Sequence, residues 1–354
     1  MTKRERVKEA FAFRKADRIP RYDIFLPEFQ EIWKNEKGLP PETDIYAAYP
    51  KIDIGDIGCD PRGPLFSQAR ILSRDGDAYI ELDSWGRTVQ KRDGAYFFRI
   101  IDTVLNDRSK LDGLEFEDTV SESTARSFGR WAARAEQRFA PVSGVIGLFN
   151  ACLYMRGDED FLADLGEDPS FVKALVERLK PHVMNTGLQV LSATNTWDTA
   201  IWFYDEYSSR LGPLFSPKMF EDIFLPAISE IIGVLKSNGA QNIILHCDGN
   251  SLPLLDMLIS AGFTGIQSMA PTAGMWLPDV QKLCRGKLTL IGGMCNMTTL
   301  AKGTKAEIRR EAEAIVDVGR EGGVIIGTHS IGDDVPVENY DYYYSVMEDL
   351  DAKW

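Results

Sequence analysis

Short apolar runs alternate with segments of helical periodicity from about residue 140 onward. Each run suits a buried strand, and the segment that follows repeats its apolar residues at helical spacing. The predicted strands are residues 142–147, 199–204, 242–246, 263–268, 287–291 and 323–328. Ser216 followed by Pro217 marks a helix start, with serine as the N-cap and proline at the first helical position. This alternation predicts βαβ units and a parallel sheet.

The number of strand candidates favours a closed (β/α)8 TIM barrel. Residues 2–14 predict a helix and residues 21–26 a further strand, which brings the chain to about eight strand candidates. A Rossmann sheet would carry Gly-x-Gly-x-x-Gly at its first strand–helix turn, and that motif is missing here. A length of 354 residues could form two domains, but α/β barrels commonly exceed about 250 residues. We predict a single TIM-barrel domain over residues 1–354 with an N-terminal helical extension.

The hydrophobic period falls to two between about residues 70 and 104. Glycine-containing turns separate the alternating stretches, which predicts a β-hairpin or small meander inserted into the barrel. Trp85, in the sequence Asp83-Ser-Trp-Gly-Arg87, belongs either to a surface turn of this insertion or to a lid that adds an aromatic wall to the site. Residues 28–63 are too irregular to assign.

Composition and charge exclude several classes of partner. The formal net charge of −13 argues against a nucleic acid or an anionic membrane, because both need a basic surface. The five cysteines form no CxxC pair, so neither a disulfide framework nor a zinc ribbon is indicated. The N-terminal segment lacks the apolar run of a signal peptide, and no apolar run approaches the roughly 20 residues that span a bilayer. We expect a cytoplasmic enzyme.

Polar residues with metal-binding side chains gather where the predicted strands end. Two of the three histidines lie there: His246 in the run Ile-Ile-Leu-His-Cys-Asp-Gly, and His329 after Gly-Val-Ile-Ile-Gly-Thr. In a barrel these strand ends converge on one mouth. The candidates there are Asp205, Glu206, His246, Asp248, Gln267, Cys295 and His329. Imidazole and carboxylate together suit zinc, whereas each histidine alone could be a satisfied polar group.

Two neighbouring residues are less certain members of this set. Glu221 lies within the first two turns of the helix that Ser216 opens, beside its apolar stripe. It either points toward the mouth or is favoured there by the helix dipole. Cys247 lies between His246 and Asp248, but the alternation of side chains along a strand directs it away from both.

Several motifs resemble the uroporphyrinogen decarboxylase superfamily, and the likeness extends over nearly the whole chain. They are Ser216-Pro…Pro226, Gly239…His246-Cys-Asp-Gly-Asn, Gly292-Gly293, Gly322-Gly323…His329 and Pro336-Val-Glu-Asn. The resemblance implies a distorted TIM barrel. True uroporphyrinogen decarboxylases carry an arginine-rich N-terminal segment that grips propionate groups, and Arg21-Tyr-Asp-Ile-Phe-Leu stands in that region here. An acidic mouth would also repel a substrate with eight carboxylates.

The cobalamin-dependent methyltransferase branch of the superfamily is the better match. The thiol methyltransferases of this branch show a His-x-Cys-Gly zinc motif with a later cysteine, and this chain departs from that motif. Here His246 matches the histidine, Asp248 stands at the first cysteine and His329 at about the second. Sulfur ligands raise electron density on zinc, whereas oxygen and nitrogen ligands leave it a stronger Lewis acid. A thiol acceptor is therefore not favoured.

The first methyltransferases of bacterial O-demethylase systems resemble this chain more closely. Their zinc motif is two glutamates separated by fourteen residues, followed by a histidine. Glu206 and Glu221 have fourteen residues between them, although the 24 residues from Glu221 to His246 exceed the about twenty that the resemblance implies. Asp83-Ser-Trp-Gly-Arg87 is also similar to the Asp-Glu-Trp-Gly-Arg of related members.

The resemblance implies a zinc-dependent methyltransferase that moves a methyl group from a small donor, expected to be a methoxylated aromatic, to the corrinoid (cobalamin) of a separate corrinoid protein. It implies three sets of residues: the metal ligands Glu206, Glu221 and His246, the catalytic residues Asp205, Asp248 and His329, and the cofactor-binding residues Trp85, Gln267 and Cys295. A homodimer is possible. The alternatives are a methylcorrinoid-to-thiol or tetrahydrofolate methyltransferase, a divergent decarboxylase, and a barrel without catalytic activity.

Overall fold

Eight parallel strands form the central sheet of the computed structural model, which describes residues 1–354 except 60–61, 96–97, 118–121 and 285. Their order is β1 (Arg21–Tyr22), β14 (Val324–Gly327), β13 (Thr289–Gly293), β12 (Gly265–Gln267), β11 (Ile243–His246), β8 (Ile201–Tyr204), β7 (Ala140–Ile146) and β2 (Ile54–Cys59). The end strands β1 and β2 approach each other where Asp53 N–H donates to Arg21 O at 2.8 Å. With helices between the strands, this is the predicted (β/α)8 TIM barrel. Strand β2 lies in the segment that the sequence left unassigned.

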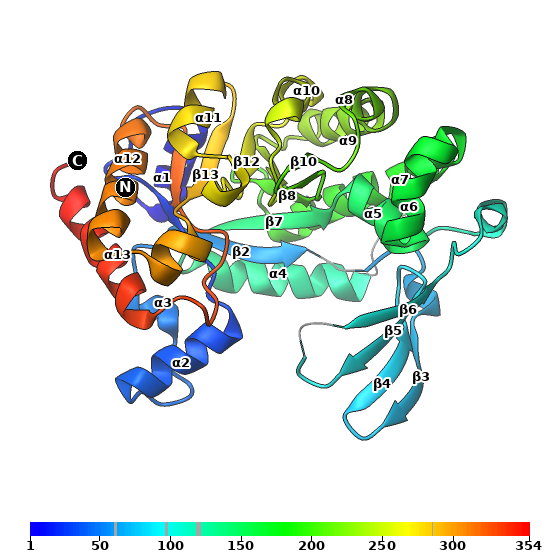
Figure 1. The fold of residues 1–354 in the computed structure, drawn as a ribbon, viewed down its shortest axis with the longest axis horizontal. Helices are drawn as coiled ribbons and strands as arrows, with labels where there is room; N and C mark the ends of the chain where they lie inside the picture. The colour runs from blue at the N-terminus through cyan, green and yellow to red at the C-terminus, as the bar shows by residue number, and fades with distance from the viewer. Residues whose placement is uncertain (60–61, 96–97, 118–121, 285) are drawn as a thin grey trace.

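Helices follow the strands in the predicted alternation (Figure 1). Ser216 caps its helix as expected, because its Oγ accepts the Met219 N–H at 3.1 Å. The predicted helix from 216 to 238 contains a π-turn, η3, between α8 and α9. The main helices are α1 (Lys3–Phe11), α2 (Pro27–Lys37), α3 (Ile45–Ala48), α4 (Glu122–Glu136), α5 (Leu148–Arg156), α6 (Asp158–Glu167), α7 (Pro169–Thr194), α8 (Pro217–Met219), η3 (Phe220–Phe224), α9 (Leu225–Ser237), α10 (Leu255–Ala261), α11 (Leu277–Cys284), η6 (Asn296–Leu300), α12 (Lys305–Gly319) and α13 (Val337–Asp351).

The barrel interior is filled by one inward-facing residue set from successive strands. Its members are Tyr22, Ile54, Val142, Trp202, Ile244, Ile291 and Ile325, closed from the N-terminal end by Val7, Ala10 and Phe11 of α1. Ile243 and Leu245 point instead into the outer core, between the sheet and the helices. Because strand side chains alternate, the inward position after Ile244 belongs to His246. The packing of β11 therefore directs His246 into the barrel mouth.

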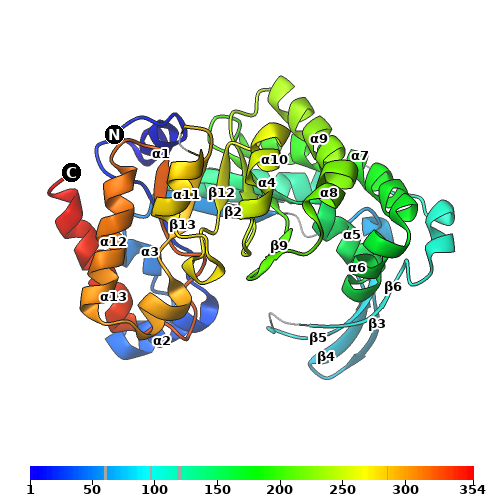
Figure 2. The same ribbon diagram turned by 45° about the horizontal axis from the view of Figure 1, so that its top comes forward.

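A four-stranded antiparallel sheet occupies the segment for which the period of two predicted a hairpin or meander. It consists of β3 (Arg70–Asp75), β4 (Ala78–Leu82), β5 (Arg87–Arg92) and β6 (Arg99–Thr103). Figure 2 shows this sheet standing away from the barrel on the side of α5 and α6, with α2 and α13 on the opposite side.

Trp85 lies in the turn between β4 and β5 and is 2% exposed. Its ring packs edge-on against Tyr154 of α5 and His182 of α7, with centroid separations of 5.3 and 5.9 Å. The Asp83 carboxylate holds the turn by accepting the N–H groups of Trp85 and Arg87, both at 2.9 Å. The structure thus places Trp85 in the core at the base of the inserted sheet, away from the strand-end group described below.

In the part of the chain that the structure describes, no helix combines the length and the apolar character needed to cross a membrane.

Candidate metal centre

Three side chains meet at the C-terminal ends of β11 and β14. His246, Asp248 and His329 each present a ligand atom, and these atoms all lie within 4.8 Å of one another. The Asp248 Oδ1 atom is 3.2 Å from His329 Nε2 and 3.7 Å from His246 Nε2. His246 and Asp248 are two residues apart, so they share a face, and His329 reaches them from the other side of β12 and β13. The structure therefore brings two residues predicted as catalytic together with one predicted as a metal ligand.

Glu206, after β8, extends this group on the side of His246. Its Oε1 lies 3.4 Å from His246 Nε2, and its Oε2 accepts the Asp248 backbone N–H at 2.9 Å. The Glu206 N–H donates in turn to Asn150 Oδ1 at 3.2 Å. Burial raises the pKa of Glu206; His246 opposes this increase, whereas the Asp248 carboxylate adds to it. Glu206 is thus held beside the two histidines and Asp248, and we call these four residues the mouth group.

The spacing and chemistry of the mouth group fit a tetrahedral metal ion. Zinc–ligand bonds of about 2.0–2.1 Å separate the ligand atoms of a tetrahedral site by about 3.3 Å. Three separations between its ligand atoms are 3.2, 3.4 and 3.7 Å, and those of His246, Asp248 and His329 all lie within 4.8 Å of one another. Two imidazoles and two carboxylates are a donor set that zinc accepts. The sulfur of Cys247 is not among the ligand atoms that gather at His246, Asp248 and His329. Cys247 is 3% exposed, its sulfur contacts Ser251 Oγ at 3.4 Å, and its thiol also bonds to the Glu206 side chain.

Side chains around the mouth group hold its members in place. Ser268 Oγ donates to Asp248 Oδ1 at 2.8 Å. Gln267, which is fully buried, contacts His246 Nδ1 through its Oε1. The His329 Nδ1 atom lies 2.9 Å from Ser330 Oγ. Burial lowers the pKa of His329, an effect that the Asp248 carboxylate opposes. Each histidine therefore has a partner on Nδ1 and presents Nε2 to the carboxylates.

Asp205 precedes Glu206 but points away from the mouth. It is fully buried, and its carboxylate accepts the N–H groups of Phe149 and Asn150 in the first turn of α5, at 3.3 and 2.8 Å. Burial raises the pKa of Asp205 to about 7, although bonds from Tyr207 and the α5 amides counteract it. These contacts make Asp205 a cap for α5, which carries Asn150 and thereby supports Glu206. Among the described residues, no hydrogen bond or ion pair joins the Asp205 carboxylate to a side chain of the mouth group. The catalytic role of Asp205 therefore stays a prediction.

The raised pKa of Asp205 predicts how stability depends on pH. The folded state binds this proton more tightly than the unfolded chain, so its stabilising contribution is complete below about pH 4 and is lost as the pH rises to about 7. The free energy of unfolding of Asp205→Asn minus that of wild type should therefore increase as the pH rises over this interval, by at most about 1.4 kcal/mol per pH unit. Urea denaturation at several pH values measures it. A difference that stays constant with pH would contradict the assignment.

Glu221 lies outside the mouth group. It is in the π-turn η3, with its side chain 57% exposed and its Oε2 3.3 Å from Lys218 Nζ. Its role as a metal ligand stays a prediction. Its exposed position favours the other interpretation, in which the helix dipole accounts for a glutamate at this place. Cys295 is also apart from the group: it is buried, and its sulfur lies 2.9 Å from Thr298 Oγ1.

Tyr204 belongs to the surroundings of the mouth group, although the sequence did not single it out. Its ring centroid lies 5.1 Å from that of His246, and its hydroxyl donates to Asp56 of β2. Tyr204 is two residues before Glu206 and so faces the same way. The alternation of side chains along a strand was therefore enough to predict its direction. Asp56 had no such signal, because its strand was not recognised.

A cavity of about 340 Å³ opens beside Asp248 and His329. Apolar atoms of Ala270, Ala273 and Met297 contribute to its walls. Its volume is in the range of small-molecule sites. The side chains of Asp248 and His329 are 49% and 34% exposed, so they can be reached from outside. The mouth group is therefore accessible to a small ligand.

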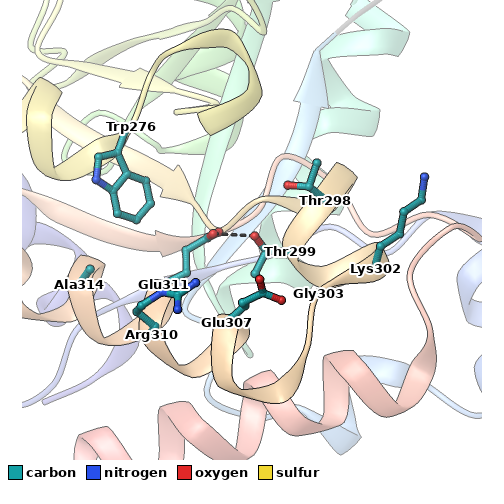
Figure 3. Close-up of a pocket in the computed structure, with 9 residues that line it drawn as sticks. All are labelled: Trp276, Thr298, Thr299, Lys302, Gly303, Glu307, Arg310, Glu311 and Ala314. Carbon is teal, nitrogen blue, oxygen red and sulfur yellow. Dashed lines mark hydrogen bonds between the residues drawn. The ribbon is translucent and has the colours of Figure 1, made fainter.

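A larger cavity of about 660 Å³ lies against η6 and α12 (Figure 3). Asn296 and Met297 line the smaller cavity, whereas Thr298 and Thr299 line the larger one. Figure 3 shows Glu311 bonded to Thr299, whose Oγ1 donates at 2.6 Å; Glu311 also accepts the Cys295 N–H at 2.6 Å. Glu311 thus binds residues at both ends of η6. It thereby also stabilises the position of Met297, which belongs to η6 and lines the smaller cavity. The larger cavity contains no member of the mouth group.

Gly249, which follows Asp248, lies too close to a neighbouring backbone for a larger residue. A Cβ atom there would lie 2.0 Å from Ser208 O and 2.6 Å from Ser209 O. We expect Gly249→Ala to lower the free energy of unfolding by about 1–3 kcal/mol and to displace Asp248. Gly233→Ala, on the exposed face of α9 with no atom within 4 Å of the added Cβ, should instead stabilise by about 0.5–1 kcal/mol. Thermal unfolding of both variants tests the contrast, and equal effects would refute it.

Comparisons with known proteins agree with this architecture. A methyltransferase from Methanosarcina mazei has a similar structure, with a TM-score of 0.69 and 13% sequence identity over 99% of each chain. The B12-independent methionine synthase from Shewanella sp. W3-18-1 in complex with selenomethionine is a more distant match, with a TM-score of 0.39 and 14% identity over 81% of this chain and 75% of that one. Curated protein sequences yield no significant match. The profile of the family described as Uroporphyrinogen decarboxylase (URO-D) matches residues 76–350, most of the chain, and the protein therefore belongs to this family.

Proposed function

We propose that this protein is a zinc-dependent methyltransferase that moves a methyl group from a small methyl donor, a methoxylated aromatic, to the cobalt of a separate corrinoid protein. The observation that carries the proposal is the mouth group: two imidazole nitrogens and the Asp248 carboxylate lie within 4.8 Å of one another, with the Glu206 carboxylate 3.4 Å from His246 Nε2, beside an accessible cavity. The likeness to the methyltransferase from Methanosarcina mazei supports the reaction class.

The composition of the mouth group favours cleavage of a methyl ether over methylation of a thiol. The residues that would hold zinc are His246, Asp248 and His329, with Glu206 as a fourth ligand or as the group that one substrate atom displaces. When bound by nitrogen and oxygen alone, zinc supplies a strong Lewis acid toward an ether oxygen. Among the described residues, no cysteine sulfur belongs to the set formed by His246, Asp248 and His329. Cys247 bonds to Ser251 and to the Glu206 side chain, and Cys295 contacts Thr298.

The residues of the chain then have separate tasks. His246 and His329 would hold the metal beside the reacting oxygen of the donor, and Ala270, Ala273 and Met297 provide an apolar wall for its ring. The corrinoid of the partner protein would supply the two-electron nucleophile that accepts the methyl group, and the C–O bond pair would stay on the oxygen of the donor. The phenolate oxygen takes up one proton, and Asp248 or Glu206 lies where it can deliver that proton from water.

The direct test is methyl transfer to cob(I)alamin from a panel of methoxyaromatics, methylamines and methylthiols, monitored by the visible spectrum. We expect methylcobalamin from a methoxyaromatic and from neither of the other classes. Failure of every donor would overturn the proposal. Demethylation of methylcobalamin by a thiol or by tetrahydrofolate, without reaction of any methoxyaromatic, would instead establish the reverse direction. Release of carbon dioxide from a porphyrinogen would establish a decarboxylase.

A further inference from the structure

Gln267 is placed to decide which nitrogen of His246 is free to bind a ligand. His246 and Gln267 are paired residues of the neighbouring parallel strands β11 and β12, so their side chains emerge next to each other into the barrel. The backbone holds this register, with Cys247 N–H donating to Gln267 O at 2.8 Å. Gln267 is 0% exposed and so has little freedom to move.

The contact between the two side chains joins one particular pair of atoms. Gln267 presents its Oε1 to His246 Nδ1. A carboxamide oxygen can only accept, so this arrangement requires the proton on Nδ1 and leaves the Nε2 lone pair free. On the other side of the ring, Nε2 lies 3.4 Å from Glu206 and 3.7 Å from Asp248, too far for a good hydrogen bond.

The reversed amide would fit less well. If Gln267 presented its NH₂ group to Nδ1, the proton of the neutral ring would move to Nε2, where the nearest acceptor is 3.4 Å away. The NH₂ group of Gln267 has no hydrogen-bond partner among the described residues, so neither orientation is favoured by a second contact. The structure makes this contact through Gln267 Oε1, and that orientation places the proton of the neutral ring on Nδ1.

We infer that Gln267 is a positioning residue that holds His246 in the Nδ1–H form and thereby directs Nε2 toward the metal. The use of this nitrogen for zinc rests on the proposed function, whereas the position of the proton in the metal-free protein does not. A histidine ligand is commonly fixed in this way by a hydrogen bond to its other nitrogen, and loss of that partner typically lowers metal affinity about 10–100-fold. Here the partner is a neutral, fully buried amide.

The test is a set of four substitutions examined by ¹⁵N NMR of histidine-labelled, metal-free protein at a pH where the rings are neutral. The chain has only three histidines, and a His246→Gln sample assigns the signal of interest. We expect wild type to carry the proton on Nδ1. Gln267→Glu retains an acceptor and should keep it there, whereas Gln267→Met preserves length without an acceptor and should shift it toward Nε2. Gln241→Met, at an exposed position, is the control.

Zinc affinity, measured by competition with a chromophoric chelator, provides the second readout. We expect a loss of about 10–100-fold in Gln267→Met and a change of less than about threefold in Gln267→Glu and Gln241→Met. A wild-type proton on Nε2, or a Gln267→Met variant with an unchanged proton position, would overturn the inference. If wild type binds no zinc, the proposed function fails, and the NMR comparison still decides the role of Gln267.

Discussion

Replacing His246 with alanine is expected to remove zinc from the purified protein and to abolish methyl transfer. His246 is the member of the mouth group whose Nε2 faces both Glu206 and Asp248. Loss of a direct ligand should reduce zinc affinity by more than the roughly 10–100-fold that accompanies loss of an outer partner. Metal analysis after dialysis against buffered zinc measures the effect.

The matched control is His182→Ala. His182 is buried beside Trp85, and its Nδ1 lies 2.6 Å from Glu117 O, so it belongs to the core and not to the mouth group. This substitution should lower stability but leave one zinc per folded molecule. Equal zinc content in wild type and His246→Ala would show that the mouth group is not the metal site. Asp248→Ala and His329→Ala extend the comparison to the other two residues.

The second large effect concerns the two glutamates that the spacing of the sequence singled out. Glu206→Gln should weaken zinc binding and slow methyl transfer, because its carboxylate lies 3.4 Å from His246 Nε2 and also holds the Asp248 backbone. Glu221→Gln should leave both properties within about twofold of wild type, since an exposed ion pair such as that with Lys218 contributes little.

This pair of variants separates the two interpretations of the glutamate motif. A loss of zinc in Glu221→Gln comparable to that in Glu206→Gln would mean that η3 rearranges when metal binds and brings Glu221 to the mouth. Lys218→Gln is the control for the ion pair itself, because it removes the partner of Glu221 without touching either carboxylate. We expect zinc affinity and the rate of methyl transfer to be far lower in Glu206→Gln than in Glu221→Gln, Lys218→Gln and wild type.

Much of the mouth group could be predicted from local sequence. In Ile-Ile-Leu-His-Cys-Asp-Gly, the period of two of a strand is enough to place His246 and Asp248 on one face and to turn Cys247 into the outer core. The position of His329 followed from the end of another apolar run, because parallel strands of a barrel end at the same mouth. Capping chemistry also sufficed for the helix start at Ser216.

Other features depended on contacts between distant parts of the chain. Strand β2 has a register shift where it pairs with β7, and its glycine-rich sequence shows no regular alternation, so it was not recognised. The face on which Glu221 lies was not predictable either, because a π-turn changes the angular position of the residues around it. Asp205 stands next to Glu206 in sequence, yet the first turn of α5 occupies its carboxylate.

The sequence by itself determined the barrel class, the strand ends and the direction of His246 and Asp248, because side-chain periodicity and capping act over a few residues. Tertiary structure decided which side chains stand beside them. The pairing of β11 with β12 places Gln267 against His246 Nδ1, and the path of β8 brings Glu206 to the other nitrogen, Nε2. Strand register and helix phase set these contacts through packing over the whole barrel, which a local pattern does not contain.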